Sequence, residues 1–125
     1  MTNRGGRILI VDDEPSLLKM MDAYLVRLGY QVTTLTSTDA AWQAVQAGPA
    51  EFDVAVLDAT MPGMAMEDLA MHLLRINPAI AVVAASGYPV DMTALEAEAP
   101  QRVAFLFKPF APDMLAETVR RMIGT

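Results

Sequence analysis

Five short apolar runs, each followed by a segment with apolar residues at helical spacing, most constrain how this chain can fold. The expected strands are residues 7–11, 31–35, 53–58, 80–85 and 103–107. These runs are rich in β-branched residues, whereas the segments between them carry apolar residues every three to four positions. Strands that alternate with helices form parallel sheets, because each return to the sheet crosses over through a helix. The sequence therefore predicts an α/β fold of five strand and helix units.

The expected helices carry start and stop signals. The first runs from about Glu14 to Leu28, with Pro15 in its first turn and Gly29 at its end. Its inward-facing residues are expected to be Leu17, Met21, Tyr24, Leu25 and Leu28. The second helix is expected from Ser37 or Thr38 through Val45, and the third ends at Asn77-Pro78. A short acidic helix with Asp91, Glu96 and Glu98 is expected before Pro100, and a last helix over residues 112–123.

Right-handed crossovers leave few ways to wind five such units. The strand order 2-1-3-4-5 places the three most apolar strands in the centre and the mixed run 31–35 at an edge. We therefore expect one (βα)5 doubly wound, flavodoxin-like domain over residues 1–125, with no room for a second domain. Such sheets bind ligands at the carboxyl ends of the strands, near the switch point between strands one and three.

Charged or polar residues stand at the carboxyl ends of four expected strands: Asp12 and Asp13, Asp58, Ser86 and Lys108. All of them can line one cleft, because parallel strands end at the same edge of a sheet. Three carboxylates in one place require a cation, and hard oxygen ligands without His or Cys favour Mg²⁺. With the metal bound, Asp58 can act as a nucleophile toward a phosphoryl group while Lys108 neutralises charge.

The composition narrows the function classes. Nine Lys and Arg against 15 Asp and Glu give a formal net charge of −6, which argues against direct binding of nucleic acid. The absence of Cys excludes disulfides and thiolate metal sites. No signal peptide is apparent, and no run approaches the ~18 apolar residues of a membrane span. A cytoplasmic protein is expected.

Four motifs, in this order and spacing, resemble those of the bacterial two-component response regulator receiver domain, of the kind typified by the chemotaxis receiver. They are Val11-Asp12-Asp13-Glu14, Leu57-Asp58-Ala59-Thr60-Met61-Pro62-Gly63, Ala85-Ser86-Gly87-Tyr88 and Phe107-Lys108-Pro109-Phe110. The resemblance covers nearly the whole chain. It implies a phosphorylation-dependent signalling switch that assists its own phosphorylation and dephosphorylation, and not an enzyme with a turnover substrate.

The resemblance also implies the roles of the residues at the site. Asp58 accepts a phosphoryl group from a histidine kinase or a histidine phosphotransfer protein, and Lys108 neutralises its charge. Mg²⁺ is bound by Asp13 and Asp58 directly, by Asp12 through water, and by the backbone carbonyl of Thr60.

The expected signal passes from the site to a binding face. Ser86 is implied to be the switch hydroxyl and Phe105 the switch aromatic, and the Lys108-Pro109 bond is expected to be cis. The face of the fourth helix, fifth strand and last helix is expected to bind an unknown output partner or a second copy of the chain. Charged residues that can pair across such a dimer are Asp91, Glu96, Glu98, Asp113, Glu117, Arg120 and Arg121.

Two positions depart from the family pattern. Met66 stands where these families usually carry a glycine that starts the third helix, so we expect a looser or displaced loop, with Gly63 supplying flexibility. Phe105 stands where Tyr is common and lacks its hydroxyl, so the switch is expected to be weaker or purely steric. We also hypothesise that Tyr88 and Thr60 border the phosphoryl group and that bulky Tyr88 slows hydrolysis.

Other interpretations remain open from the sequence. Taken singly, Asp12 and Asp13 suit a helix N-terminus, Lys108 a solvated lysine and Ser86 a turn. One alternative function is a degenerate receiver that binds partners without phosphorylation. Another is a haloacid dehalogenase-type phosphatase, which normally needs an Asp where this chain has Thr60.

A few further residues carry expectations of their own. Trp42 is expected to pack in the core or at its edge, and His72 to be exposed without a role. The ten methionines include Met20, Met64, Met71 and Met92, which suit either gap-filling or an adaptable binding surface. Only Gly124-Thr125 follows the last helix, so no output domain is visible.

Overall fold

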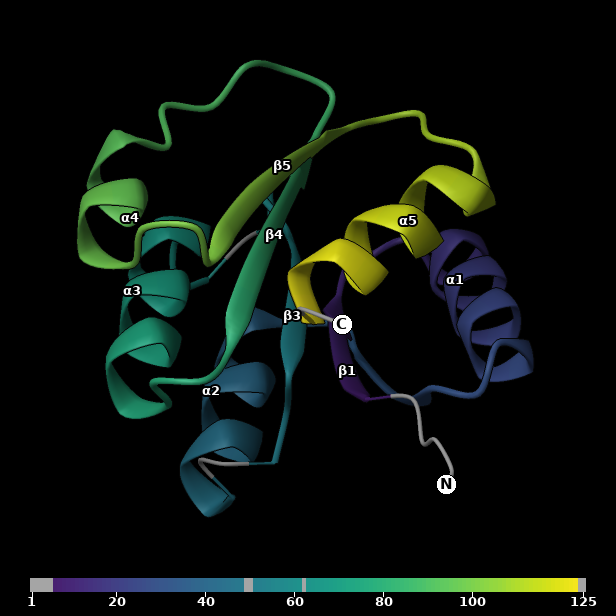
Figure 1. Cartoon of the computed structure of the whole chain (residues 1–125), viewed down its shortest axis with the longest axis horizontal. Helices are drawn as coiled ribbons and strands as arrows, with labels where there is room; N and C mark the ends of the chain where they lie inside the picture. Colours follow the sequence, from purple (N-terminus) through teal and green to yellow (C-terminus); the bar gives the residue numbers. More distant parts are fainter. Residues whose placement is uncertain (1–5, 49–50, 62, 124–125) are drawn as a thin grey trace.

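The computed structural model describes residues 6–48, 51–61 and 63–123, and shows a sheet with helices on both faces (Figure 1). In chain order the elements are β1 (Arg7–Val11), α1 (Pro15–Arg27), β2 (Gln31–Leu35), α2 (Thr38–Ala47), β3 (Val54–Asp58), α3 (Met66–Ile76), β4 (Ala81–Ser86), α4 (Thr93–Glu98), β5 (Val103–Phe107) and α5 (Pro112–Ile123). The described part of the chain contains no helix long and apolar enough to cross a membrane.

The sheet has five parallel strands in the order β2-β1-β3-β4-β5. This confirms the predicted flavodoxin-like α/β fold and the edge position of β2. Three strand boundaries differ by one residue: β3 begins at Val54, and β4 begins at Ala81 and extends to Ser86. Asp53 lies just before β3, and its carboxylate accepts a hydrogen bond from the backbone N–H of Arg7, at 2.8 Å.

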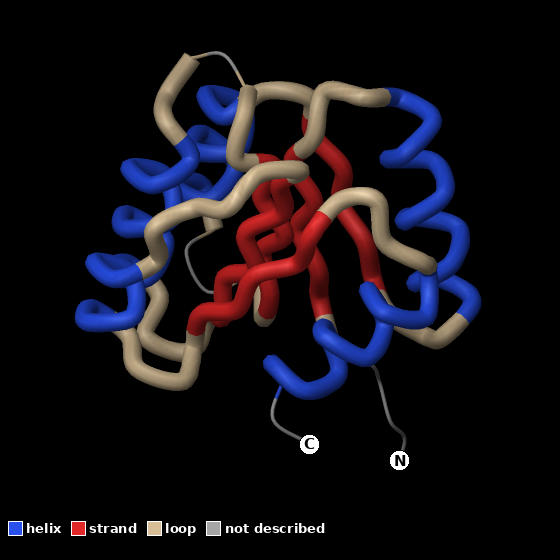
Figure 2. The backbone as a smooth tube through the Cα atoms, turned by 90° about the horizontal axis from the view of Figure 1, so that it is seen from above, coloured by secondary structure: helices blue, strands red, loops and turns tan. Residues whose placement is uncertain are grey.

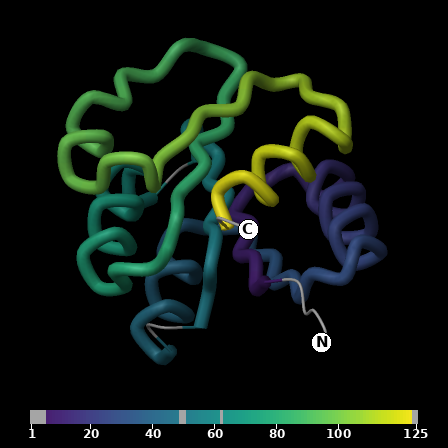
Figure 3. The backbone as a smooth tube through the Cα atoms, in the orientation of Figure 1, coloured from purple at the N-terminus to yellow at the C-terminus, as the bar shows by residue number. Residues whose placement is uncertain are grey.

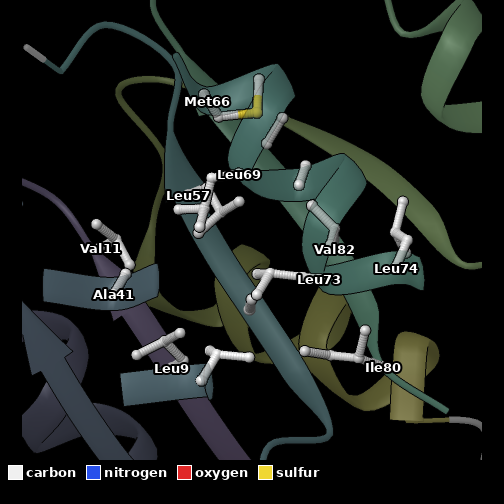
Figure 4. Packing of buried hydrophobic residues seen from close by; sticks show 14 of the residues in the cluster. Leu9, Val11, Ala41, Leu57, Met66, Leu69, Leu73, Leu74, Ile80 and Val82 are labelled. Carbon is white, nitrogen blue, oxygen red and sulfur yellow. The ribbon is translucent and has the colours of Figure 1, made fainter. Parts of the chain in front are cut away.

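The helices flank both faces of the sheet (Figure 2), and two hydrophobic layers hold them to it. Alternate residues of each strand point to opposite faces, so every central strand contributes to both layers. One layer joins the sheet to α1 and α5, through residues such as Ile10, Leu25 and Leu115. The other joins it to α2, α3 and α4, and Figure 4 shows Leu57 and Leu69 within it.

Helix α1 differs from the expected pattern of burial. Its fully buried residues are Leu18, Met21 and Leu25. The buried stripe is therefore rotated slightly, and Leu17 and Tyr24 lie at its margins, partly buried. Leu28 follows the last helical residue and is 53% exposed, so its predicted burial is wrong.

Two helix ends follow the sequence signals, and the start of α4 differs. The Ser37 hydroxyl accepts a hydrogen bond from the backbone N–H of Ala40, as expected for an N-cap. Gly29 ends α1 with a φ of +102°, a conformation that glycine adopts without steric strain. Asp91 lies before α4 and not within it, because its carboxylate accepts a hydrogen bond from the backbone N–H of Thr93.

Met66, at the position of the usual glycine, is well packed at the start of α3. Met66 is the first residue of the helix, and its side chain is buried in the layer shown in Figure 4. Gly63 has a φ of +92°, and a Cβ there would lie 3.1 Å from Thr38 Oγ1. The side chain that replaces the usual glycine therefore packs into the core, while Gly63 makes the turn against α2.

The remaining apolar side chains mostly fill gaps in the core. Met20, Met64, Met71 and Met92 are partly buried against the two layers, which favours the gap-filling interpretation. Trp42 is also partly buried, as predicted. Exposed His72 stacks on it with ring centroids 4.8 Å apart, a contact that the sequence did not indicate.

Candidate functional site

The carboxyl ends of the strands meet at one edge of the sheet, at the top of Figure 3, where the chain leaves β4 and β5. Val11 and Leu57 are paired across β1 and β3, so Asp12 and Asp58, one residue further along, lie side by side. The backbone N–H of Lys108 donates to the Ser86 carbonyl across β4 and β5. The sheet register thus brings together the residues predicted to form one cleft.

Three carboxylates form the centre of this site. Each of Asp12, Asp13 and Asp58 offers an oxygen, and these three atoms lie within 4.8 Å of one another. Asp12 is 2% exposed and Asp58 4% exposed, whereas Asp13 is exposed. Burial of carboxylates without compensation is unfavourable, so this arrangement is not explained by packing.

Local hydrogen bonds orient two of the carboxylates. Asp12 Oδ1 accepts from the backbone N–H of Glu14, at 3.0 Å, at the turn that leads into α1. Asp58 Oδ1 accepts from both the backbone N–H of Thr60, at 3.1 Å, and the Thr60 hydroxyl, at 3.0 Å. The second oxygen of each group is thereby left to face the other charged side chains.

Lys108 supplies the positive charge. Its Nζ donates to Asp12 Oδ2 at 2.7 Å and lies 3.4 Å from Asp58 Oδ2. Burial by itself lowers the pKa of Lys108, but the hydrogen bond and charge of Asp12 and the charge of Asp58 outweigh it. The pKa is therefore raised above the ordinary 10.5, and the ammonium is charged at neutral pH.

The donor set fits a hard divalent cation. Three carboxylates against one ammonium leave two negative charges uncompensated within the cluster. All three donors are oxygen atoms, which Mg²⁺ prefers, and the exposed Asp13 leaves the cluster open to water and substrate oxygens. The structure thus brings together the three predicted carboxylate ligands.

Of the two predicted switch residues, Ser86 ends β4 beside the strand of Asp58, and Phe105 lies further back in β5. Ser86 is 1% exposed, and its hydroxyl accepts a hydrogen bond from the backbone N–H of Tyr88 at 3.0 Å. The Tyr88 side chain is 72% exposed. Phe105 lies in β5, paired with Ala84, and is partly buried. The Lys108-Pro109 peptide bond is cis, as expected.

Two features of the site were not found from the sequence. A cavity of about 370 Å³ adjoins Lys108 and is lined by Glu14, Leu17, Lys108, Pro109 and Phe110. Phe107 contacts Phe105 in a T-shaped arrangement with ring centroids 4.6 Å apart. Two Phe residues at spacing two on one strand were the available signal for this contact, because such residues share a face.

The fold and site define a doubly wound α/β protein with an acidic cluster and a lysine at the carboxyl edge of its sheet. The family model of the response regulator receiver domain matches residues 8–120, so the chain belongs to this family. This confirms the resemblance drawn from the four motifs.

Individual relatives agree with this assignment. The chain is 26% identical to the chemotaxis protein CheY of Thermotoga maritima over 120 residues, which cover 94% of this chain and 98% of that protein. It is 32% identical over 116 residues to the sensor kinase CckA of Brucella abortus. That match covers 93% of this chain but only 12% of the kinase, so the chain spans a small part of this relative.

A solved structure shows the same fold. The receiver domain from the hybrid histidine kinase CckA superimposes with a TM-score of 0.80 at 26% identity, covering 94% of this chain and 99% of that one. Receiver domains act in two-component signalling as phosphorylation switches, bind Mg²⁺ at an acidic pocket, and interact with histidine kinases and output domains. They are signalling domains and not turnover enzymes of the usual kind.

Proposed function

We propose that residues 1–125 form one receiver domain and that Asp58 is its phosphoacceptor. The observation that carries the proposal is the position of the Lys108 ammonium, 2.7 Å from Asp12 and 3.4 Å from Asp58. A single cation shared by two buried carboxylates suits a site that receives further negative charge. Family membership supports the same role.

The proposed reaction is transfer of a phosphoryl group from a phosphohistidine of a histidine kinase or a histidine phosphotransfer protein. An Asp58 carboxylate oxygen attacks phosphorus, an O–P bond forms and the P–N bond breaks. The electron pair of the broken bond remains on the ring nitrogen, and with the other ring nitrogen protonated the leaving imidazole is neutral. Lys108 keeps its proton and lies near the negative phosphoryl oxygens.

The carboxylates of Asp12, Asp13 and Asp58 would hold Mg²⁺, and the backbone carbonyl of Thr60 is a further proposed ligand. A divalent cation there supplies neutralisation of the charge on the phosphoryl oxygens. Because the Thr60 N–H and hydroxyl both donate to Asp58 Oδ1, this loop holds the acceptor carboxylate in a fixed orientation. Asp12, by its bond to Glu14, ties the start of α1 to the same cluster.

The proposed relay runs through Ser86 and Phe105. The Ser86 hydroxyl accepts a hydrogen bond from Tyr88, so its own proton is available to donate to a phosphoryl oxygen. Movement of Ser86 then opens space for Phe105, which carries the change to the face of α4, β5 and α5. This face is where we propose that the output partner binds.

A homodimer through this face would rely on fewer ion pairs than the sequence suggested. Glu98 already pairs with Arg75 of α3, at 3.2 Å. The Thr93 side chain and backbone N–H hydrogen-bond to Asp91 and lower its pKa, before α4 begins. Glu96 on α4 and the Arg120 and Arg121 pair on α5 are the charges we propose for such a dimer.

Incubation with Mg²⁺ and acetyl phosphate, followed by intact mass measurement, tests the acceptor. We expect the mass to rise by one phosphoryl group in the native chain and not in Asp58→Asn. An adduct that survives in Asp58→Asn would assign the acceptor elsewhere. No adduct in the native chain would favour a phosphorylation-independent binding module, and sustained hydrolysis of a phosphomonoester would favour a phosphatase.

A further inference from the structure

Two phenylalanines on β5 stand beside the switch serine. Across β4 and β5, Phe105 is paired with Ala84 and Phe107 with Ser86. Residues two apart on a strand share a face, so Ser86, Phe105 and Phe107 all point to the same side of the sheet. Neighbouring strands lie about 4.8 Å apart, so Phe107 is the direct lateral neighbour of Ser86.

Phe107 is unusual in its exposure. Its side chain is 55% exposed on the edge strand, whereas its neighbour Ser86 is 1% exposed. Because much of the Phe107 ring remains in water, burial of apolar area stabilises its position only a little. The contact with Phe105 is therefore the main interaction of this ring to consider. The ring centroids are 4.6 Å apart and the planes meet at 82°, an edge-to-face geometry that stabilises aromatic pairs beyond the area they bury.

We propose that Phe107 is a positioning residue that holds Phe105 in its resting orientation and so weakens the response of the switch to a phosphoryl group. This inference rests on the proposed function, because it assigns Phe105 to the relay. The proposal requires that rotation of the Phe105 ring toward Ser86 breaks the T-shaped pair. A pair of this kind changes an equilibrium by about two- to tenfold.

The same contact sets the apparent affinity for a phosphoryl mimic. A ligand that requires a sparsely populated conformation binds more weakly by the fraction of the protein in that conformation. Removing the Phe107 ring raises the population in which Phe105 has rotated. The change in affinity on removing the Phe107 ring should depend on the presence of the Phe105 ring. This dependence distinguishes a positioning residue from one that only stabilises the fold.

Beryllofluoride with Mg²⁺ is the probe, and its apparent affinity is measured from the amide chemical shifts of Ser86 and Lys108. Phe107→Val retains a residue suited to a strand. We expect it to bind about two- to tenfold more tightly than the native chain. In a Phe105→Ala background the same substitution is expected to have no effect. Thermal unfolding of each variant confirms that it is folded.

Leu28→Ala is the matched control, because Leu28 is 53% exposed and lies at the end of α1. We expect its affinity for beryllofluoride to equal that of the native chain. An unchanged or weaker affinity in Phe107→Val overturns the inference, as does an equal effect in both backgrounds, while the proposed function stands. If the native chain does not bind beryllofluoride, both fail.

Discussion

At the amino ends of the strands, buried or partly buried polar side chains bind backbone groups, whereas at the carboxyl ends charged side chains face one another. Arg102 illustrates the first arrangement. Its Nε donates to the Ile80 carbonyl at 2.8 Å, and one terminal nitrogen donates to the carbonyls of Asn77 at 2.9 Å and Leu74 at 3.3 Å. These carbonyls lie at the end of α3 and just before β4, where a cation also complements the helix dipole.

Asn77 makes similar contacts with backbone groups at the amino ends of the strands. Its side-chain N–H donates to the Phe52 carbonyl, and its Oδ1 accepts from the backbone N–H of Ala79, both at 3.0 Å. The side chains at this end therefore satisfy the backbone where elements begin and end. At the opposite end, three carboxylates lie together, and one ammonium pairs with two of them. The amino ends of the strands thus stabilise the fold, whereas the carboxyl ends keep excess negative charge that a ligand can neutralise.

Arg102→Ala should give the largest loss of stability, because it removes hydrogen bonds at the amino ends of the strands. Three backbone carbonyls lose the Arg102 donor, although that of Asn77 keeps the Ile80 N–H at 3.2 Å. We expect the free energy of unfolding to fall by about 2 to 4 kcal/mol. Urea denaturation measures the change. Arg102→Lys should recover part of it, because an ammonium replaces the charge but not the planar set of donors. A loss no larger than that of Arg75→Ala, which removes an exposed ion pair, would contradict this role for Arg102.

Mg²⁺ should stabilise the protein only through the carboxyl end. A ligand bound solely by the folded state adds about 1.4 kcal/mol at ten times its Kd. We expect this shift in thermal unfolding for the native chain and for Arg102→Lys, and a much smaller one for Asp13→Asn. Without Mg²⁺, Asp13→Asn should be slightly more stable than the native chain, because one of three like charges is removed. Equal stabilisation of all three proteins would place the metal elsewhere.

The two ends should also differ in their response to alkaline pH. The raised pKa of Lys108 means that its ion pairs stabilise the fold fully below the ordinary lysine pKa of 10.5. This stability is lost as the pH rises through the raised pKa of the folded state. The contacts at the amino ends contain no lysine, so no such loss is expected there.

Unfolding free energies of the native chain and Lys108→Gln, measured from pH 8 to about 12, test this. The difference between the two should shrink at the alkaline end of the range. Lys19→Gln serves as the control, since Lys19 is the other lysine of the chain. If the difference in unfolding free energy between the native chain and Lys108→Gln does not change with pH, the ion pairs of Lys108 contribute nothing to stability.

Tyr88 should give the smallest effect, confined to the carboxyl end. Its backbone N–H donates to Ser86, but its ring is 72% exposed and can shield the phosphoryl group only in part. We expect Tyr88→Ala to lose the phosphoryl group about two- to threefold faster, a barrier change of about half a kcal/mol. Intact mass followed over time measures the rate. An unchanged or slower rate would remove Tyr88 from the control of hydrolysis.

The candidate site was largely predictable, because parallel strands end at one edge and the strand periodicity placed Asp12, Asp13, Asp58, Ser86 and Lys108 there. The effect of Met66 was not. Its position suggested a loose loop, yet its side chain packs in the core at the start of α3. Whether a large side chain disturbs a turn or anchors it depends on the space that other elements leave.

The sequence by itself determined the element order, the strand order and the family, because these follow from periodicity, crossover handedness and motif spacing along the chain. Only the tertiary structure decided that Lys108 lies nearer Asp12 than Asp58, that Arg102 binds the end of α3, and that Phe107 contacts Phe105. These contacts depend on strand register and on side-chain packing between distant segments. The pattern of residues along the chain does not specify strand register or side-chain packing in atomic detail.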